Sequence, residues 1–199
     1  KQRMDEIIEA AKLADKLNLN VFGVGEHHRL DYVVSSPVVV LSAIAQATKK
    51  IKLTSTTSVV STLDPVRLFE DFATLDLISG GRAEILAGRG AFVESFPLFG
   101  YDLNDYNELF SEHMALLLQL NEEEIVTWSG RFRPSLHQAQ IAPRPLQQKL
   151  PIWIGVGGTP QSAVRAGRLG VGMALAILGG LPERFKPLVD IYRNAGLEA

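Results

Sequence analysis

Short apolar segments alternate with longer amphipathic stretches along the chain, and this alternation restricts the fold more than any other feature. Near the amino end, Ile7, Ala11 and Ala14 recur at helical spacing, whereas β-branched residues fill much of the run from 51 to 60. Five segments are predicted as buried strands: Val21–Gly25, Ile51–Val60, Arg82–Ala87, Leu150–Val156 and Val171–Ile177. The chain is therefore predicted to be α/β with a parallel sheet, either doubly wound or a (β/α)8 barrel.

Residues with special backbone preferences mark the helices between these strands. Asp64 and Pro65 suit the N-cap and the first position of a helix that ends at Ser79-Gly80-Gly81. Further helices are predicted for residues 37–49, 104–121, 159–169 and 181–195. The segment 122–145 contains short extended pieces and three prolines, and a long insertion of this kind usually carries function or covers something. We expect it to help cover the functional site.

Composition narrows the class of protein. The 199 residues are predicted to form a single domain, 1–199. A net charge of −2 without a basic surplus argues against a nucleic-acid partner, and no apolar run approaches the roughly 20 residues of a membrane span. Cysteine is absent, which excludes disulfides and thiolate metal sites and fits a reducing cytoplasm. The charged opening, residues 1–5, gives no sign of a signal peptide.

The first candidate for chemistry is Glu26-His27-His28, which follows a predicted strand. Sites of parallel α/β proteins lie at the carboxyl ends of strands, and histidine can transfer protons near neutral pH. Successive residues of an extended chain point to opposite faces, so His27 and His28 are not expected to share a metal ion. A purely structural role for these residues is the competing interpretation.

Two further strand ends carry polar side chains. Thr56 and Thr57 can line a pocket with hydroxyl groups, although threonine is also common in strands for its β-branched shape. Arg89 stands between two glycines, which allow close approach of a ligand, and its guanidinium suits a phosphate. The alternative for Arg89 is a turn with a surface arginine.

The turn from 155 to 162 joins a strand to a helix. Gly157 and Gly158 leave room for a phosphate near the free amides of the helix start, and Thr159 and Ser162 add hydroxyl donors. This turn lacks the dinucleotide fingerprint, which needs glycine where Pro160 stands. An ordinary capped turn is the alternative.

Six motifs occur together in an order that resembles the bacterial-luciferase-like flavin-dependent monooxygenases. They are Glu26-His27-His28, Asp64-Pro65-Val66-Arg67, Leu75-Asp76 through Ser79-Gly80-Gly81-Arg82, Gly88-Arg89-Gly90, Pro143-Arg144-Pro145-Leu146-Gln147 and Pro151-Ile152-Trp153-Ile154-Gly155. The resemblance runs nearly end to end. It implies a (β/α)8 TIM barrel, here incomplete: relatives begin with an earlier strand and continue with two more after Ala199, so this chain is expected to hold strands two to six.

The resemblance also implies roles for individual residues. His27 matches the active-site histidine, Thr56 and Thr57 match a strand end beside the flavin ring that often has a non-proline cis peptide, and Arg89 matches the arginine on the flavin phosphate. The remaining assignments are a phosphate-cradling turn at Gly157, Gly158, Thr159 and Ser162, and a substrate pocket at Glu26, His28 and Phe92.

By this resemblance, the expected activity is oxidation of a small organic substrate by O2 and reduced FMN. A separate flavin reductase would deliver the FMN transiently, and the protein would be a cytoplasmic homodimer. Three alternatives remain: a deazaflavin-dependent enzyme that transfers hydride, a (β/α)8 hydrolase with a divalent metal at Glu26, His27 and His28, and a non-catalytic flavin-binding relative.

Overall fold

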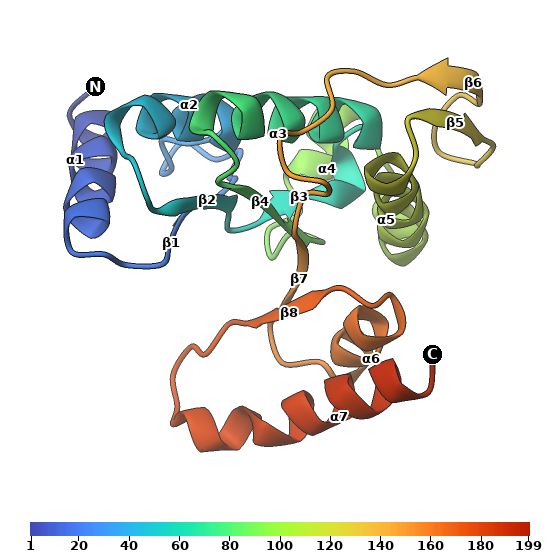
Figure 1. Ribbon diagram of the computed structural model, residues 1–199. Coiled ribbons are helices and arrows are strands. Elements are labelled where there is room, and N and C mark those ends of the chain that lie inside the picture. Colours follow the sequence, from blue (N-terminus) through green and yellow to red (C-terminus); the bar gives the residue numbers. More distant parts are fainter.

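The computed structural model describes residues 1–199 as a curled parallel sheet with helices along its outer face (Figure 1). The helices are α1 (Gln2–Lys16), α2 (Pro37–Ala47), α3 (Pro65–Ser79), α4 (Ser95–Phe99), α5 (Tyr106–Glu122), α6 (Pro160–Arg168) and α7 (Lys186–Leu197), with 3-10 turns η1 (Val60–Thr62), η2 (Leu103–Asp105) and η3 (Pro182–Phe185). The strands are β1 (Val21–Val24), β2 (Lys52–Ser55), β3 (Ser58–Val59), β4 (Ala83–Gly88), β5 (Ile125–Trp128), β6 (Leu136–Gln140), β7 (Ile152–Val156) and β8 (Gly172–Leu175).

The main sheet has the order β1-β2-β4-β7-β8, and all of its pairings are parallel. Its strands confirm the five predicted segments, with one difference. The run from 51 to 60 is interrupted at Thr56-Thr57: β2 ends before this dipeptide, and β3 after it pairs with β4. In Figure 1, α2 and α3 lie above the sheet, whereas α6 and α7 lie below β7 and β8. None of the helices combines the length and the apolar composition that a membrane span requires.

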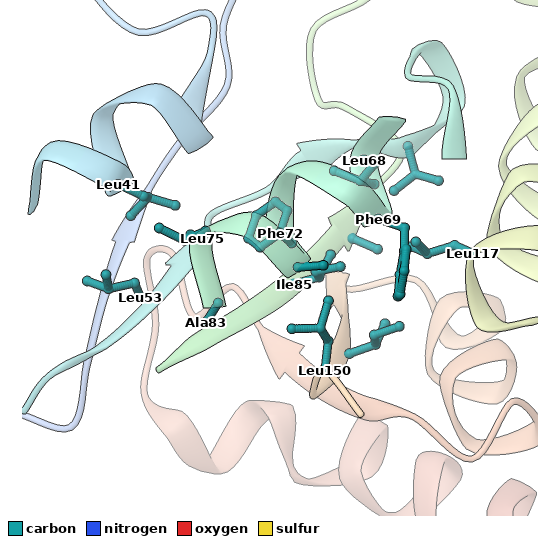
Figure 2. Packing of buried hydrophobic residues seen from close by; sticks show 14 of the residues in the cluster. Leu41, Leu53, Leu68, Phe69, Phe72, Leu75, Ala83, Ile85, Leu117 and Leu150 are labelled. Atoms are coloured by element: carbon teal, nitrogen blue, oxygen red, sulfur yellow. The ribbon is translucent and has the colours of Figure 1, made fainter. Parts of the chain in front are cut away.

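The two faces of the sheet differ in chemistry. Leu53 and Ile85 point outward into a core that includes Phe69 and Phe72 of α3 (Figure 2). Because side chains alternate along a strand, neighbouring positions face the inside of the curl. There Glu84 accepts hydrogen bonds from Lys52 and Trp153, at 2.5 and 3.0 Å. The apolar outer face holds the helices, and the inner face carries the polar side chains of Lys52 and Glu84 beside Trp153.

The segment 122–145, which was predicted to cover the site, packs against the outer helices instead. It forms the antiparallel hairpin β5–β6, which packs along α5 (Figure 1). The backbone of Arg131 donates to Glu112 of α5, and Arg133 pairs with Asp64 at 3.0 Å. No residue from 122 to 145 lines the cavity at the strand ends. The expectation of a cover was therefore wrong, since these polar contacts hold the hairpin against the outer helices.

Arg82 joins three elements at the amino end of β4. Its Nη1 donates to the carbonyl of Ile51, its Nη2 to that of Ala45 in α2, and its Nε to that of Ser79 in α3, at 2.8, 2.9 and 2.8 Å. Carbonyls at helix ends have no partner within the helix, so the guanidinium satisfies groups that would otherwise be left without one. Burial lowers the pKa of Arg82, but arginine remains charged in proteins.

A second junction lies beside it. Asp76 is 0% exposed and accepts hydrogen bonds from the backbone of Ala83 and from the backbone and side chain of Gln147, at 3.1, 2.9 and 2.8 Å. Gln147 also donates to the carbonyl of Ala83. Nearby, Arg144 donates to the carbonyls of Leu120 and Asn121 at the end of α5. Two of the motifs that carried the family resemblance thus fix the amino ends of strands, away from the strand ends that carry the candidate site.

Replacement of Arg82 by methionine should destabilise the protein by about 2–4 kcal/mol, because several partly buried carbonyls lose a charged donor. Arg3→Met is the matched control: the side chain of Arg3 is 80% exposed, and its loss should cost less than about 0.5 kcal/mol. Urea denaturation of both variants measures the difference. Equal losses of stability would refute the role of Arg82 as a junction.

Candidate active site

The carboxyl ends of the parallel strands surround a cavity of about 500 Å³. Most of the residues singled out from the sequence line it, namely Glu26, His27, His28, Thr56, Thr57, Arg89, Phe92 and Gly157. Gly158, Thr159 and Ser162 lie outside the lining but at the start of α6, next to Gly157. The parallel register therefore brings together groups that are up to 131 positions apart, from Glu26 to Gly157.

Glu26 fixes the end of β1. Its side chain is 2% exposed, and its Oε1 lies 2.9 Å from Nε2 of His28. Its Oε2 accepts the backbone N–H of Val59 at 3.0 Å. Both carboxylate oxygens thus have partners within the protein. This residue orients His28 and ties the loop after β1 to β3.

His27 is arranged differently from its neighbour. Its ring stacks on Tyr32 with the centroids 3.9 Å apart, and it meets the edge of Phe92 at 5.2 Å. Its backbone N–H donates to the carbonyl of Val34, whereas neither ring nitrogen makes a hydrogen bond within the protein. The aromatic contacts hold the imidazole in place and leave its nitrogens free for a ligand.

The same residues do not form a metal site. Glu26 pairs with His28, while His27 stacks on Tyr32. Nowhere in the protein do three or more histidine, aspartate or glutamate side chains gather as a set of metal ligands. The metal-dependent hydrolase, weighed as an alternative, therefore lacks the ligand cluster it would need at this position.

Three glycines form a floor beneath the two threonines, and we call Gly23, Gly88 and Gly155 the glycine floor. A Cβ on Gly88 would lie 2.2 Å from Oγ1 of Thr57, and one on Gly155 would lie 2.9 Å from its Cγ2. A Cβ on Gly23 would lie 2.2 Å from Cγ2 of Thr56. The peptide bond between the threonines is cis, as the family resemblance implied. Close packing across four strands thus sets the position of both hydroxyl groups.

Arg89 lies at another side of the cavity and is held by neutral partners. Its Nη1 donates to Asn107 at 2.9 Å, and its Nη2 donates to Oγ of Ser162 at 3.1 Å. Its guanidinium carbon is 5.2 Å from the centre of the Tyr106 ring, and the Tyr106 hydroxyl donates to the carbonyl of Gly90. The charge is therefore oriented by groups that do not neutralise it.

The start of α6 stands next to Arg89. Thr159 is the N-cap residue but caps no backbone N–H with its side chain; instead its hydroxyl lies 2.7 Å from that of Ser162. A Cβ added to Gly157 or Gly158 would meet nothing within 4 Å, and Gly158 has a φ of 131°, which favours glycine. Open space, backbone N–H groups and a fixed guanidinium thus meet at one point, which suits an anion.

Arg165, one turn further along α6, was not among the residues singled out from the sequence. Burial lowers its pKa, and the neighbouring charge of Arg89 lowers it further. Its guanidinium carbon is 5.3 Å from the centre of the Phe110 ring. Two arginines near one helix start strengthen the positive character of this region. The spacing of three residues from Ser162 to Arg165 was the available signal, because such residues share a helix face.

The chain is similar to known proteins over its whole described length. The family model described as luciferase-like monooxygenase matches residues 1–199. The oxygenase component of flavin-dependent trigonelline monooxygenase from Acinetobacter baylyi is 28% identical over 163 residues, which is 77% of this chain and 43% of that protein. An F420-dependent glucose-6-phosphate dehydrogenase from Amycolatopsis mediterranei is 27% identical over 176 residues, 84% of this chain and 52% of that protein.

Monooxygenase RslO1 from Streptomyces bottropensis has a similar crystal structure, with a TM-score of 0.90 and 28% identity over 100% of this chain and 61% of that chain. The curled parallel sheet is therefore part of a (β/α)8 barrel, which confirms the predicted fold. The chain spans about half the length of the curated relatives it matches.

The contact between Thr57 and the glycine floor predicts a coupled pair of substitutions. Gly155→Ala alone should cost about 1–3 kcal/mol, because the new methyl group overlaps with Cγ2 of Thr57. Thr57→Ser removes that methyl group and should restore most of the loss in the double variant. Gly157→Ala, in open space, is the control and should stay within about 0.5 kcal/mol of the original protein. A double-mutant cycle from urea denaturation tests this, and strictly additive losses would contradict it.

Proposed function

The chain belongs to the luciferase-like monooxygenase family, and from this premise we propose that it oxidises a small organic substrate with O2 and reduced FMN. The observation that carries the proposal is the division of the cavity. Arg89 and the start of α6 offer an anion site on one side, and His27 offers free ring nitrogens on another. The anion site suits the phosphate of a redox cofactor, and His27 suits a role as the group that transfers a proton.

The residues present fit the phosphate of FMN. Arg89 can donate to phosphate oxygens while Asn107 and Ser162 hold it in place, and arginine suits phosphate because its donors are planar and fixed. Gly157 and Gly158 leave the space that a Cβ would fill, and Thr159 and Ser162 add hydroxyls. Arg165 adds positive charge beside them.

The glycine floor suits the ring of the cofactor. Because Gly88 and Gly155 carry no side chains, Thr57 packs close against their strands. A flat group can then lie in the cavity beside Thr56 and Thr57. Reduced FMN, when bound, supplies the electrons for activation of O2. The protein positions the ring and keeps water away from the reacting atoms, and the apolar lining residues Val59 and Leu86 serve this second purpose.

His27 is the proposed catalytic residue. Its ring is oriented by Tyr32 and Phe92, and its nitrogens are free to donate or accept a proton at a bound ligand. Glu26, His28 and Phe92 form the neighbouring wall and are proposed as the substrate side. His28 is committed to Glu26, so His27 is the better candidate for proton transfer.

The proposal extends to partners. The Acinetobacter relative is named as an oxygenase component, which supports a separate reductase as the source of reduced flavin. We propose the same division of work here, with a transient reductase contact and a cytoplasmic homodimer of the whole protein.

A deazaflavin-dependent enzyme is the second candidate. The dehydrogenase from Amycolatopsis mediterranei is named for F420 and matches 84% of this chain, so the family relationship alone permits both cofactors. Deazaflavin would carry a hydride to or from the substrate, without O2. The absorption spectra of FMN and of F420 in titrations against the protein distinguish the two.

Replacement of Arg89 by alanine should weaken binding of FMN about 100-fold, because the phosphate loses a charge-assisted donor. Arg67→Ala is the matched control, since the Arg67 side chain is 70% exposed on α3 and lies outside the cavity. Fluorescence titration with oxidised and reduced FMN measures both variants. The absence of FMN binding by the original protein would favour the deazaflavin, and equal affinities in all three proteins would contradict the assignment of Arg89.

Replacement of His27 by alanine should leave the Kd of FMN within about threefold and lower turnover by about 10²- to 10⁴-fold, which is the usual contribution of a general acid or base. Turnover is measured with reduced FMN and O2 on whichever small organic substrate the original protein oxidises. His137→Ala on the exposed strand β6 is the control. Full turnover by the His27 variant with FMN bound would remove the catalytic role.

A further inference from the structure

The hairpin β5–β6 lies beside α5 (Figure 1), and its turn holds the first turns of that helix. The side chain of Arg131 pairs with Asp105 at 3.0 Å and with Glu108 at 2.9 Å. The backbone N–H groups of Arg131 and Phe132 donate to the two carboxylate oxygens of Glu112, at 2.8 and 2.9 Å. The segment that was expected to cover the cavity thus engages three carboxylates of one helix.

The first turns of α5 separate charged from neutral side chains. The three carboxylates are spaced by three and four residues, so they share the face that the hairpin contacts. The side chains that contact the anion site come from another face and are neutral. Asn107 accepts from Arg89 at 2.9 Å, and the Tyr106 ring contacts the same guanidinium. One turn further, the Phe110 ring contacts Arg165. The helix therefore presents acids to the hairpin and neutral groups to the two arginines.

Two of these acids, Asp105 and Glu108, lie within two residues of Asn107 and so remain close to the anion site. An arginine binds a carboxylate more strongly than a neutral group, yet Arg89 pairs with Asn107 and Ser162. Unpaired, the two carboxylates would attract Arg89 and repel an anion, since charges act over about 10 Å at 0.1 M ionic strength.

Arg131 engages both of these carboxylates. Its side chain is 65% exposed, and exposed ion pairs contribute little to the stability of a fold. The consequence of this pairing therefore lies in the charge that reaches the anion site.

We propose that Arg131 is a positioning residue for the anion site. By binding Asp105 and Glu108, it keeps both carboxylates from competing for Arg89 and from repelling the phosphate bound there. The hairpin thus serves the cavity through the start of α5, without lining it. This inference rests on the proposed function, because the phosphate of the cofactor is the anion that the site would take.

Thermal denaturation in increasing inorganic phosphate, at a constant ionic strength of about 0.1 M, tests the proposal, because a bound ligand raises the melting temperature. Arg131→Met should weaken phosphate binding about fivefold, since two negative charges near the site lose their partner. Adding Asp105→Asn and Glu108→Gln to this variant removes both charges and should restore the affinity to within about twofold. Arg3→Met, which changes the net charge equally at an exposed position of α1, is the matched control and should leave the affinity unchanged.

Unchanged phosphate affinity in Arg131→Met would overturn the proposal. A loss that persists in the triple variant would also overturn it, because the missing side chain, and not the two charges, would then be the cause. The proposal fails as well if phosphate stabilises the original protein no more than it stabilises an Arg89→Ala variant, since no anion would then bind at Arg89. Failure of the original protein to bind FMN, with the expected phosphate results, would count against the proposed function alone, because the phosphate titrations contain no flavin.

Discussion

The geometry of the cavity depends on hydrogen bonds at the opposite end of the sheet. Asp76 binds the start of β4 and Gln147, which lies just before β7, while Arg82 joins the ends of α2 and α3 to the start of β2. These contacts fix the relative positions of strands whose far ends carry Arg89, Gly155 and Thr57. A shift of one residue between parallel strands would turn every side chain to the other face of the sheet. Buried polar junctions, which apolar packing alone cannot replace, thus specify the register on which the site relies.

Much of the architecture followed from local signals in the sequence. The strands were predictable because each is a short run rich in apolar or β-branched residues. Helix α3 was predictable from Asp64, which accepts from the backbone of Val66 and Arg67, and from Gly80, which adopts a φ of 72° at its end. The site was predictable only where a single strand end or turn carries the signal, as for His27 and Arg89. The contacts of Arg89 with Asn107 and Tyr106 depend on where the start of α5 lies relative to the end of β4, which no local pattern encodes. The hairpin β5–β6 was misplaced for the same reason: its composition indicated extended pieces but not the helix they pack against.

The cavity separates two kinds of electrostatic environment. One side gathers Arg89, Arg165 and the start of α6, and the positive charge there is oriented by neutral groups. Elsewhere the lining holds Glu26, whose two carboxylate oxygens are engaged by His28 and by the backbone of Val59. Between them the walls are aromatic and aliphatic. An anionic group of a bound molecule would turn toward Arg89 and the start of α6, so the orientation of that molecule follows from charge before any specific contact forms.

The glycine floor also has an evolutionary consequence. Gly155 cannot gain a side chain while Thr57 keeps its methyl group, and a Cβ on Gly88 would lie 2.2, 2.7 and 2.9 Å from Oγ1, Cβ and Cγ2 of the same threonine. A single substitution at either glycine therefore makes the protein less stable. A side chain at position 155 requires that Thr57 first lose its methyl group, whereas one at position 88 would still meet the Cβ of any residue other than glycine at position 57. Gly157, with open space around it, has no such order imposed on it. During evolution, Gly157 at the rim of the cavity can thus be replaced by a single substitution. A change at Gly88 or Gly155 in the glycine floor requires a second substitution, at Thr57, and the order of the two matters.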